Sequence, residues 1–136
     1  MTPWRWVRTD LVYAVHEIQL ARHGGLDGLR DRNAVASALA RPEQLHSYGE
    51  PAPDAAQLAA AYAYGLARNH GFSDGNKRTA WVVARVFLAD NGVHLQFSEI
   101  DAIRTMQAVA SGALDEPQLA SWFRERMKDK EAPGSS

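Results

Sequence analysis

Apolar residues recur at intervals of three and four positions along most of the chain, the spacing that places side chains on one face of a helix. In the first predicted helix this stripe comprises Leu11, Val15 and Ile18, with Val12 beside it. The glycine pair at 24–25 supplies a stop, because glycine readily adopts the left-handed conformation that follows many helices. The pattern therefore predicts an N-terminal helix that ends near residue 24.

A second helix is expected to be short. Asp31 is a suitable N-cap, and helical spacing continues through Leu39. Pro42 disfavours helical geometry at the residue before it, so this helix is predicted to stop near Arg41. The segment 42–53 contains three prolines and is predicted to be the longest connection in the chain.

Further helices are predicted after residue 53. One begins at Asp54, and another runs from about 76 to 90. The segment 93–97 is short and β-like, or an extended connector. Ser98 caps a fifth helix, and Asp115 opens a sixth.

Composition supports an all-α fold, because alanine, the residue with the highest helix propensity, occupies 23 of the 136 positions. A chain of this length forms one ordinary domain with a substantial core. We therefore predict a compact single-domain helical bundle over residues 1–128. Residues 129–136, charged and then rich in proline, glycine and serine, are predicted to form a disordered tail.

Charge and cysteine content exclude several classes of protein. Lysine and arginine number 15 against 16 acidic residues, a net charge of −1, so direct binding to nucleic acid is not expected. With no cysteine there is no disulfide, cysteine nucleophile or thiolate-bound metal. No signal peptide or membrane-spanning run is recognised, and we expect a cytoplasmic protein without a membrane partner.

Residues able to perform chemistry gather between the third and fourth predicted helices, in the segment His70-Gly71-Phe72-Ser73-Asp74-Gly75-Asn76-Lys77-Arg78-Thr79-Ala80. The first N–H groups of a helix lack intrahelical acceptors and carry partial positive charge. Gly75 would allow a ligand to approach the backbone, and Asn76, Lys77 and Arg78 add donors. The segment thus predicts an anion site suited to phosphate or pyrophosphate.

Three other residues of this segment have predicted roles. Asp74 would be repelled by a bound phosphate unless a cation intervened, which suggests Mg²⁺ held by this carboxylate. His70 is the one group here able to take a proton near neutral pH. Phe72 is apolar within a polar loop and is expected to anchor the loop in the core. A plain polar turn, with exposed cations on the following helix, is the alternative from the residues alone.

The pattern His70-x-Phe72-x-Asp74-Gly75-Asn76-Lys77-Arg78 resembles the signature of the Fic/Doc superfamily, in particular its death-on-curing (Doc) branch. The likeness extends over roughly residues 8–127. Its further landmarks are Gly24-Gly25-Leu26 with Gly28 and Asp31, Ala38-Leu39-Ala40-Arg41-Pro42, Arg78-Thr79-Ala80 and Asn91-Gly92. The resemblance implies a helical domain with its active loop between two central helices, and a toxin of a bacterial type II toxin–antitoxin pair.

The branch of the superfamily that the motif resembles determines which reaction is expected. Fic proteins that transfer AMP usually carry Gly-Asn-Gly-Arg-x-x-Arg, whereas here Lys77 replaces the second glycine and Trp81 stands in place of the second arginine. An indole cannot pair with a phosphate. Doc-type proteins instead resemble kinases that transfer the terminal phosphate of ATP to a threonine of elongation factor Tu, and this is the function that we predict.

The resemblance also assigns roles to the residues. His70 would accept the proton of an attacking Ser/Thr hydroxyl, and Asp74 would hold Mg²⁺ on the ATP phosphates. Asn76, Lys77, Arg78 and the N–H groups from Gly75 onward would stabilise the transferring phosphoryl group. An antitoxin whose disordered segment folds onto the toxin is the implied partner. A Fic-type transferase of AMP or another phospho-group, and a catalytically silent antitoxin-binding module, are the alternatives.

Residues outside the motif are more ambiguous. Arg68 could reach a phosphate or could be a structural cation at a helix end. His16, His23, His46 and His94 are scattered without ligand-like spacing, and surface or capping roles are expected for them.

Overall fold

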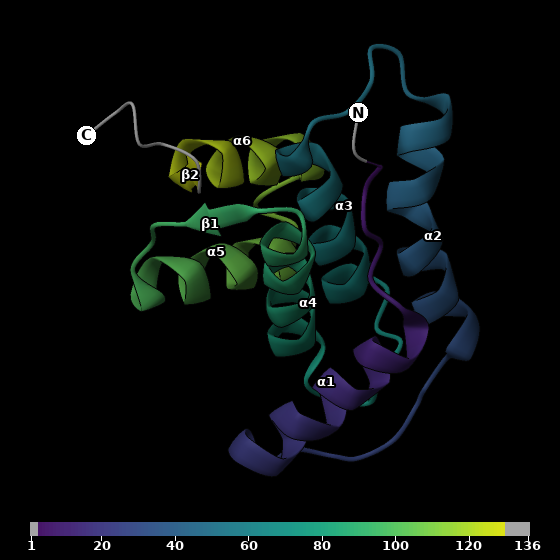
Figure 1. Cartoon of the computed structure of the whole chain (residues 1–136). Helices are drawn as coiled ribbons and strands as arrows, with labels where there is room; N and C mark the ends of the chain where they lie inside the picture. Colours follow the sequence, from purple (N-terminus) through teal and green to yellow (C-terminus); the bar gives the residue numbers. More distant parts are fainter. Residues whose placement is uncertain (1–2, 130–136) are drawn as a thin grey trace.

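A computed structural model describes residues 3–129, and within them the protein is all-helical apart from one short pair of strands. None of these helices is long and apolar enough to cross a membrane. In chain order the elements are α1 (Thr9–His23), α2 (Arg32–Tyr48), α3 (Ala55–Arg68), α4 (Asn76–Asp90), β1 (Val93–Leu95), α5 (Glu99–Ser111), α6 (Glu116–Arg126) and β2 (Met127–Asp129) (Figure 1).

Helix α3 lies at the centre of the molecule and packs against α2, α4, α5 and α6 (Figure 1). Its sequence is rich in alanine, and nine of its 14 residues are buried. Small side chains let neighbouring helices approach closely: a Cβ added at Gly65 would lie 3.1 Å from the Cβ of Ala38 on α2. The predicted all-α fold is therefore confirmed, with its core around the helix that leads into the candidate site.

Helix α2 corrects the prediction of a stop near Arg41. It continues through Pro42 to Tyr48, so the predicted connection 42–53 shrinks to the residues between Tyr48 and α3. Proline removes one helical hydrogen bond, but Pro42 is almost completely buried in the core. Arg41 is also held from outside, by an ion pair with Glu116 at 3.0 Å. Tertiary packing thus outweighs the local preference at this position.

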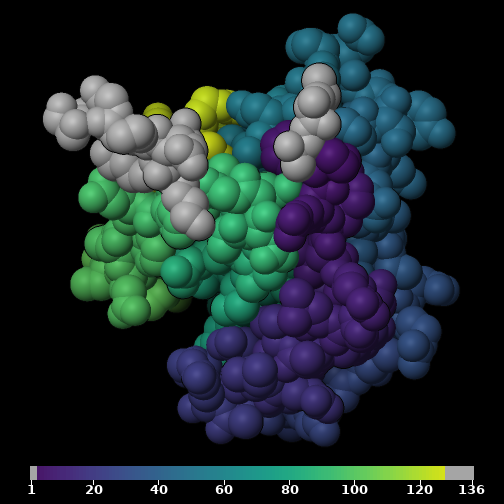
Figure 2. All heavy atoms as spheres, viewed as in Figure 1, coloured from purple at the N-terminus to yellow at the C-terminus, as the bar shows by residue number. Residues whose placement is uncertain are grey.

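Helix α1 confirms only part of the predicted face: Val12 and Val15 are buried, but the other two residues of the stripe are not. Leu11 and Ile18 are 37% and 48% exposed, whereas the buried stripe is Val12, Val15, His16 and Gln19. That stripe has the spacing of one helical face, but half of it is polar and hydrophobicity alone does not reveal it. In the space-filling view the N-terminal part of the chain forms a ridge between α2 and the C-terminal half (Figure 2).

The predicted helix starts at Asp54, Ser98 and Asp115 are confirmed by local hydrogen bonds. Asp54 and Asp115 each form a capping box with the glutamine three residues later. Ser98 accepts a hydrogen bond from the N–H of Asp101 at 3.1 Å. These starts depend on residues adjacent in sequence, which is why they could be predicted.

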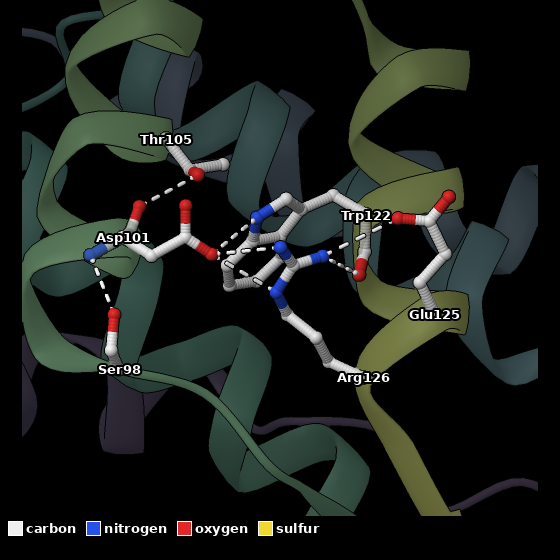
Figure 3. Close-up of polar contacts among 6 residues, drawn as sticks. All are labelled: Ser98, Asp101, Thr105, Trp122, Glu125 and Arg126. Atoms are coloured by element: carbon white, nitrogen blue, oxygen red, sulfur yellow. Dashed lines mark hydrogen bonds and ion pairs between the residues drawn. The ribbon is translucent and has the colours of Figure 1, made fainter.

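Helices α5 and α6 are joined by polar contacts centred on Asp101 (Figure 3). Its carboxylate accepts hydrogen bonds from the Trp122 indole at 3.1 Å and from Arg126 Nε at 3.0 Å. The Arg126 guanidinium also lies over the Trp122 ring, 4.3 Å from its centroid. This network holds α5 against α6. The C-terminal end of α5 in turn contacts Arg68, the last residue of α3.

Residues 93–95 of the segment predicted as β-like or extended form a short strand, and residues 96–97 lie outside it. β1 pairs antiparallel with β2, with Val93 opposite Asp129 and Leu95 opposite Met127. The tail predicted at 129–136 therefore starts within β2, and its residues 130–136 lie outside the described part of the chain.

Candidate active site

The motif loop, residues 69–75, joins α3 to α4 and is anchored by Phe72. Only 3% of Phe72 is exposed. Its ring stacks on the imidazole of His16, with centroids 3.8 Å apart, and meets Tyr13 edge-on. Helix α1 thus supplies two aromatic side chains against which the middle of the loop packs.

Asn76, the first residue of α4, closes the loop. Its side-chain oxygen accepts the N–H of Phe72 at 3.1 Å, and its Nδ2 donates to the Phe72 carbonyl at 3.0 Å. The amide has a second hydrogen left to donate. The predicted contact of Asn76 with a phosphate stays a prediction, and the described contacts give it a role in shaping the loop.

The segment 24–31 runs beside the motif loop and binds its backbone. The N–H groups of Arg30 and Asp31 both donate to the Gly71 carbonyl, at 2.8 and 2.9 Å. In the opposite direction, the Ser73 N–H donates to the Gly28 carbonyl at 3.0 Å. The two glycine-containing stretches are therefore paired through their backbones, far apart in sequence but adjacent in space.

Asp74 is exposed, and its carboxylate is oriented by backbone donors. The N–H of Gly75 donates to Oδ1 at 2.8 Å and that of Leu26 to Oδ2 at 3.3 Å. These two bonds, the Gly75 bond above all, lower the pKa of Asp74, and the positive charge of Arg78 adds to the effect. The carboxylate is thus ionised at neutral pH, and each oxygen keeps capacity for a further ligand.

His70 has an unusual backbone conformation. It is the one non-glycine residue in the described range with positive φ, at 51°. For such a residue this conformation typically costs about 1–3 kcal/mol and is concentrated at functional sites. The side chain is exposed, and among residues 3–129 no hydrogen bond holds its ring. The imidazole is therefore accessible to a substrate.

The start of α4 presents positive charge to solvent. Gly75 is the N-cap, with φ of 79°, and the next residues Lys77 and Arg78 are exposed. Within residues 3–129 neither cation takes part in an ion pair. Free N–H groups, the helix dipole and two unpaired cations together form an electrostatic environment that attracts an anion.

The residue Arg68, predicted as a phosphate ligand or structural cation, contacts another helix. Its Nη1 donates to the carbonyls of Val109 and Ala110, at 3.2 and 3.4 Å, in the last turn of α5. A cation is favourable at a helix C-terminus. This contact favours the structural interpretation of Arg68.

Sequence reasoning missed His16. It was expected on the surface or at a cap, but it is 4% exposed and its Nε2 lies 2.8 Å from the carbonyl oxygen of Asp74. The sequence carries a signal for its burial but not for its contact with Asp74: position 16 lies four residues after Val12 and one after Val15, on the same face of the helix.

Comparison with known proteins agrees with this arrangement. A sequence model of the Fic/DOC family matches residues 6–88, which contain α1 to α3, most of α4 and the whole motif. The chain belongs to the Fic/DOC family.

Two relatives place it close to Doc proteins. It is 32% identical over 120 residues to a protein of Escherichia phage P1 named "Protein kinase doc", covering 88% of this chain and 94% of the phage protein. It is 42% identical over 102 residues to "Toxin Doc" of Mycolicibacterium smegmatis, covering 72% of this chain and 77% of that protein.

Proposed function

We propose that this chain is the toxin of a bacterial toxin–antitoxin pair and acts as a protein kinase. It transfers the γ-phosphate of ATP to a serine or threonine hydroxyl of a translation factor, elongation factor Tu in the first instance. The supporting observation is an accessible histidine in a left-handed conformation, followed by a helix start with two exposed cations. The names of the two relatives agree with both parts of the proposal.

The chemistry follows from the placement of these groups. His70 accepts the proton of the substrate hydroxyl as its oxygen attacks the γ-phosphorus of ATP. The bond from that phosphorus to the bridging oxygen breaks, and ADP leaves with the electron pair. The N–H groups at the start of α4, with Lys77 and Arg78, stabilise the charge of the transferring phosphoryl group.

Asp74 is the residue that holds Mg²⁺ in this proposal. Among the described residues no three acidic or histidine side chains cluster as an all-protein metal site. Mg²⁺ is commonly bound by one or two carboxylates together with phosphate oxygens and water, so the single ionised Asp74 fits a site that the nucleotide completes. The bound ion supplies positive charge that neutralises the phosphates.

Two residues favour phosphoryl transfer over AMP transfer. Trp81 occupies the position of the second arginine of AMP-transferring Fic proteins, and its ring packs on Phe97, Trp122 and Phe123. An indole has no positive charge and no forked pair of donors, so Trp81 cannot hold an α-phosphate as an arginine would. Lys77 places a long side chain where those enzymes have glycine.

The proposed setting is the bacterial cytoplasm, where translation factors act. The proposed partner is an antitoxin with a disordered segment that folds onto the domain and suppresses its activity.

The decisive experiment uses ATP labelled separately at the α and γ positions, with purified elongation factor Tu and with whole lysate as substrates. Label from the γ position alone, on a Ser or Thr located by mass spectrometry, supports the kinase. Protein labelled from the α position would overturn it in favour of AMP transfer. Absence of any label, together with normal growth of cells that express the chain without antitoxin, would favour a silent binding module.

A further inference from the structure

His16 joins α1 to the motif loop at two points. It lies on the buried face of α1 and is 58 residues from Asp74 in sequence. Its Nε2 is 2.8 Å from the Asp74 carbonyl oxygen, and its ring stacks on Phe72 at an interplanar angle of 11°. A buried polar residue with two specific contacts to the same loop calls for an explanation beyond packing.

The hydrogen bond acts on one peptide unit. A carbonyl oxygen can only accept, so Nε2 of His16 carries the hydrogen and donates it. The Asp74 carbonyl and the Gly75 N–H belong to the same planar peptide unit, and fixing one fixes the other. That N–H donates to Oδ1 of Asp74 at 2.8 Å. His16 therefore sets, through one rigid plane, the donor that orients the Asp74 carboxylate.

The same peptide leads directly into α4. Gly75 is the N-cap and has φ of 79°, a left-handed conformation; as a glycine it can also adopt many others at little cost. A hydrogen bond on the carbonyl just before this residue restricts that freedom. The direction in which the first N–H groups of α4 point thus depends in part on the imidazole.

The stacking contact acts on the other side of the loop. Phe72 is the residue whose backbone N–H and carbonyl are both bound by Asn76. Because the Phe72 ring packs on His16, the Phe72 backbone stays in the position at which Asn76 can hydrogen-bond to it. The two contacts of His16 therefore bracket the loop between residues 72 and 75.

We propose that His16 is a positioning residue for the transfer reaction: its Nε2–H fixes the Asp74–Gly75 peptide, and through it the Asp74 carboxylate and the start of α4. The reaction itself is that of the proposed function, on which this inference rests. Groups that orient a ligand-binding side chain in this way typically affect activity about 10- to 100-fold when removed.

Two substitutions separate the hydrogen bond from the stacking. His16→Phe keeps an aromatic ring but has no donor, whereas His16→Gln keeps an N–H near the position of Nε2 without the ring. Val12→Ala is the matched control, because Val12 is fully buried one turn earlier on α1 and contributes only to the core. It lowers the melting temperature without touching the loop.

Two measurements compare these variants with the wild type. Amide hydrogen exchange of residues 71–78, without nucleotide, reports the loop itself, and steady-state kinetics gives kcat and the KM for ATP. We expect His16→Phe to raise exchange in the loop and lower kcat about 10- to 100-fold. His16→Gln should restore most of both, and Val12→Ala should leave both near the wild-type values.

The inference is overturned if His16→Phe exchanges and turns over like the wild type, or if His16→Gln is as impaired as His16→Phe. If the wild type transfers no label from γ-labelled ATP, the proposed function fails instead. Loop exchange in the same variants then decides the positioning role by itself.

Discussion

The side-chain amide of Asn76 binds both backbone groups of Phe72, accepting its N–H at 3.1 Å and donating to its carbonyl at 3.0 Å. This pairing resembles the exchange of hydrogen bonds between two strands, with a side chain in place of one backbone. It joins residues four apart and so fixes the curvature of the loop that carries Asp74. The first residue of α4 therefore shapes the site as well as standing at its edge.

Replacing Asn76 by alanine is expected to open the loop. The Phe72 N–H and carbonyl would lose their partner, which costs about 1–3 kcal/mol for a group left unsatisfied. We expect a lower melting temperature and a loss of phosphate transfer of about a hundredfold or more. Thermal unfolding and label transfer, measured on the same preparation, check this. If Asn76→Ala transferred phosphate at the wild-type rate, Asn76 would not be needed for the reaction.

His70→Ala is expected to abolish transfer and toxicity while the helical fold remains. The proton acceptor is lost, but an exposed side chain contributes little to the core. Because His70 has positive φ, His70→Gly should be equally inactive yet about 1 kcal/mol more stable than His70→Ala. Circular dichroism and chemical denaturation measure the difference. A folded and fully toxic His70→Ala protein would contradict the assignment.

Gly25 is expected to be sensitive because of Asp74. A Cβ at residue 25 would lie 2.8 Å from Oδ2 of Asp74, too close for the carboxylate to stay in place. Gly25→Ala should therefore weaken Mg²⁺-dependent nucleotide binding and transfer. Gly24→Ala is the control, since Gly24 also has positive φ but a Cβ there meets nothing within 4 Å. Equal effects of the two substitutions, measured by titration calorimetry with ATP and Mg²⁺, would show that backbone strain and not Asp74 is responsible.

Arg68→Met is expected to reduce stability and leave the KM for ATP unchanged. The substitution removes the charged donor to the last turn of α5, a contact of about 1 kcal/mol, and keeps a long side chain. Thermal unfolding and ATP titration of the rate distinguish the two interpretations of this residue. A tenfold rise in KM at constant melting temperature would instead establish Arg68 as a phosphate ligand.

Tyr62 makes the fold sensitive to alkali. Burial raises the pKa of Tyr62 to about 12 from an ordinary value of 10.0, and its hydroxyl oxygen accepts the Val7 N–H. A raised pKa means that the folded state keeps its proton where the unfolded state loses it. The contribution of protonated Tyr62 to the free energy of unfolding is thus complete below pH 10 and declines as the pH rises toward 12. Denaturation at several pH values should show this decline, and it should be absent in Tyr62→Phe but present in Tyr48→Phe, at an exposed site.

The fold could be predicted wherever the determinants are local. The caps at Asp54, Ser98 and Asp115 act within three residues, and each predicted helix start agrees with the structure. The stop at Arg41 was wrong because it rested on a local preference that burial of Pro42 overrides. The face of α1 was predicted only in part, because its buried stripe includes polar residues beside Val12 and Val15.

The site shows the same division. The motif at 70–78 is contiguous, and its residue types alone indicated an anion, a metal and a base. The contribution of His16 could not be found in this way, because it depends on a carbonyl 58 residues later. The contact of Arg68 with α5 likewise joins residues 41 apart.

The supports of the motif loop all precede it in the chain, apart from the helix that it begins. α1 provides His16, and the segment 24–31 provides the paired backbone, so both leave the ribosome before His70. An N-terminal truncation that spares every residue of the motif would still remove the contacts of α1 and of the segment 24–31 that hold the loop in place. The geometry of the motif loop is thereby tied to synthesis of a chain that is intact from its first helix onward.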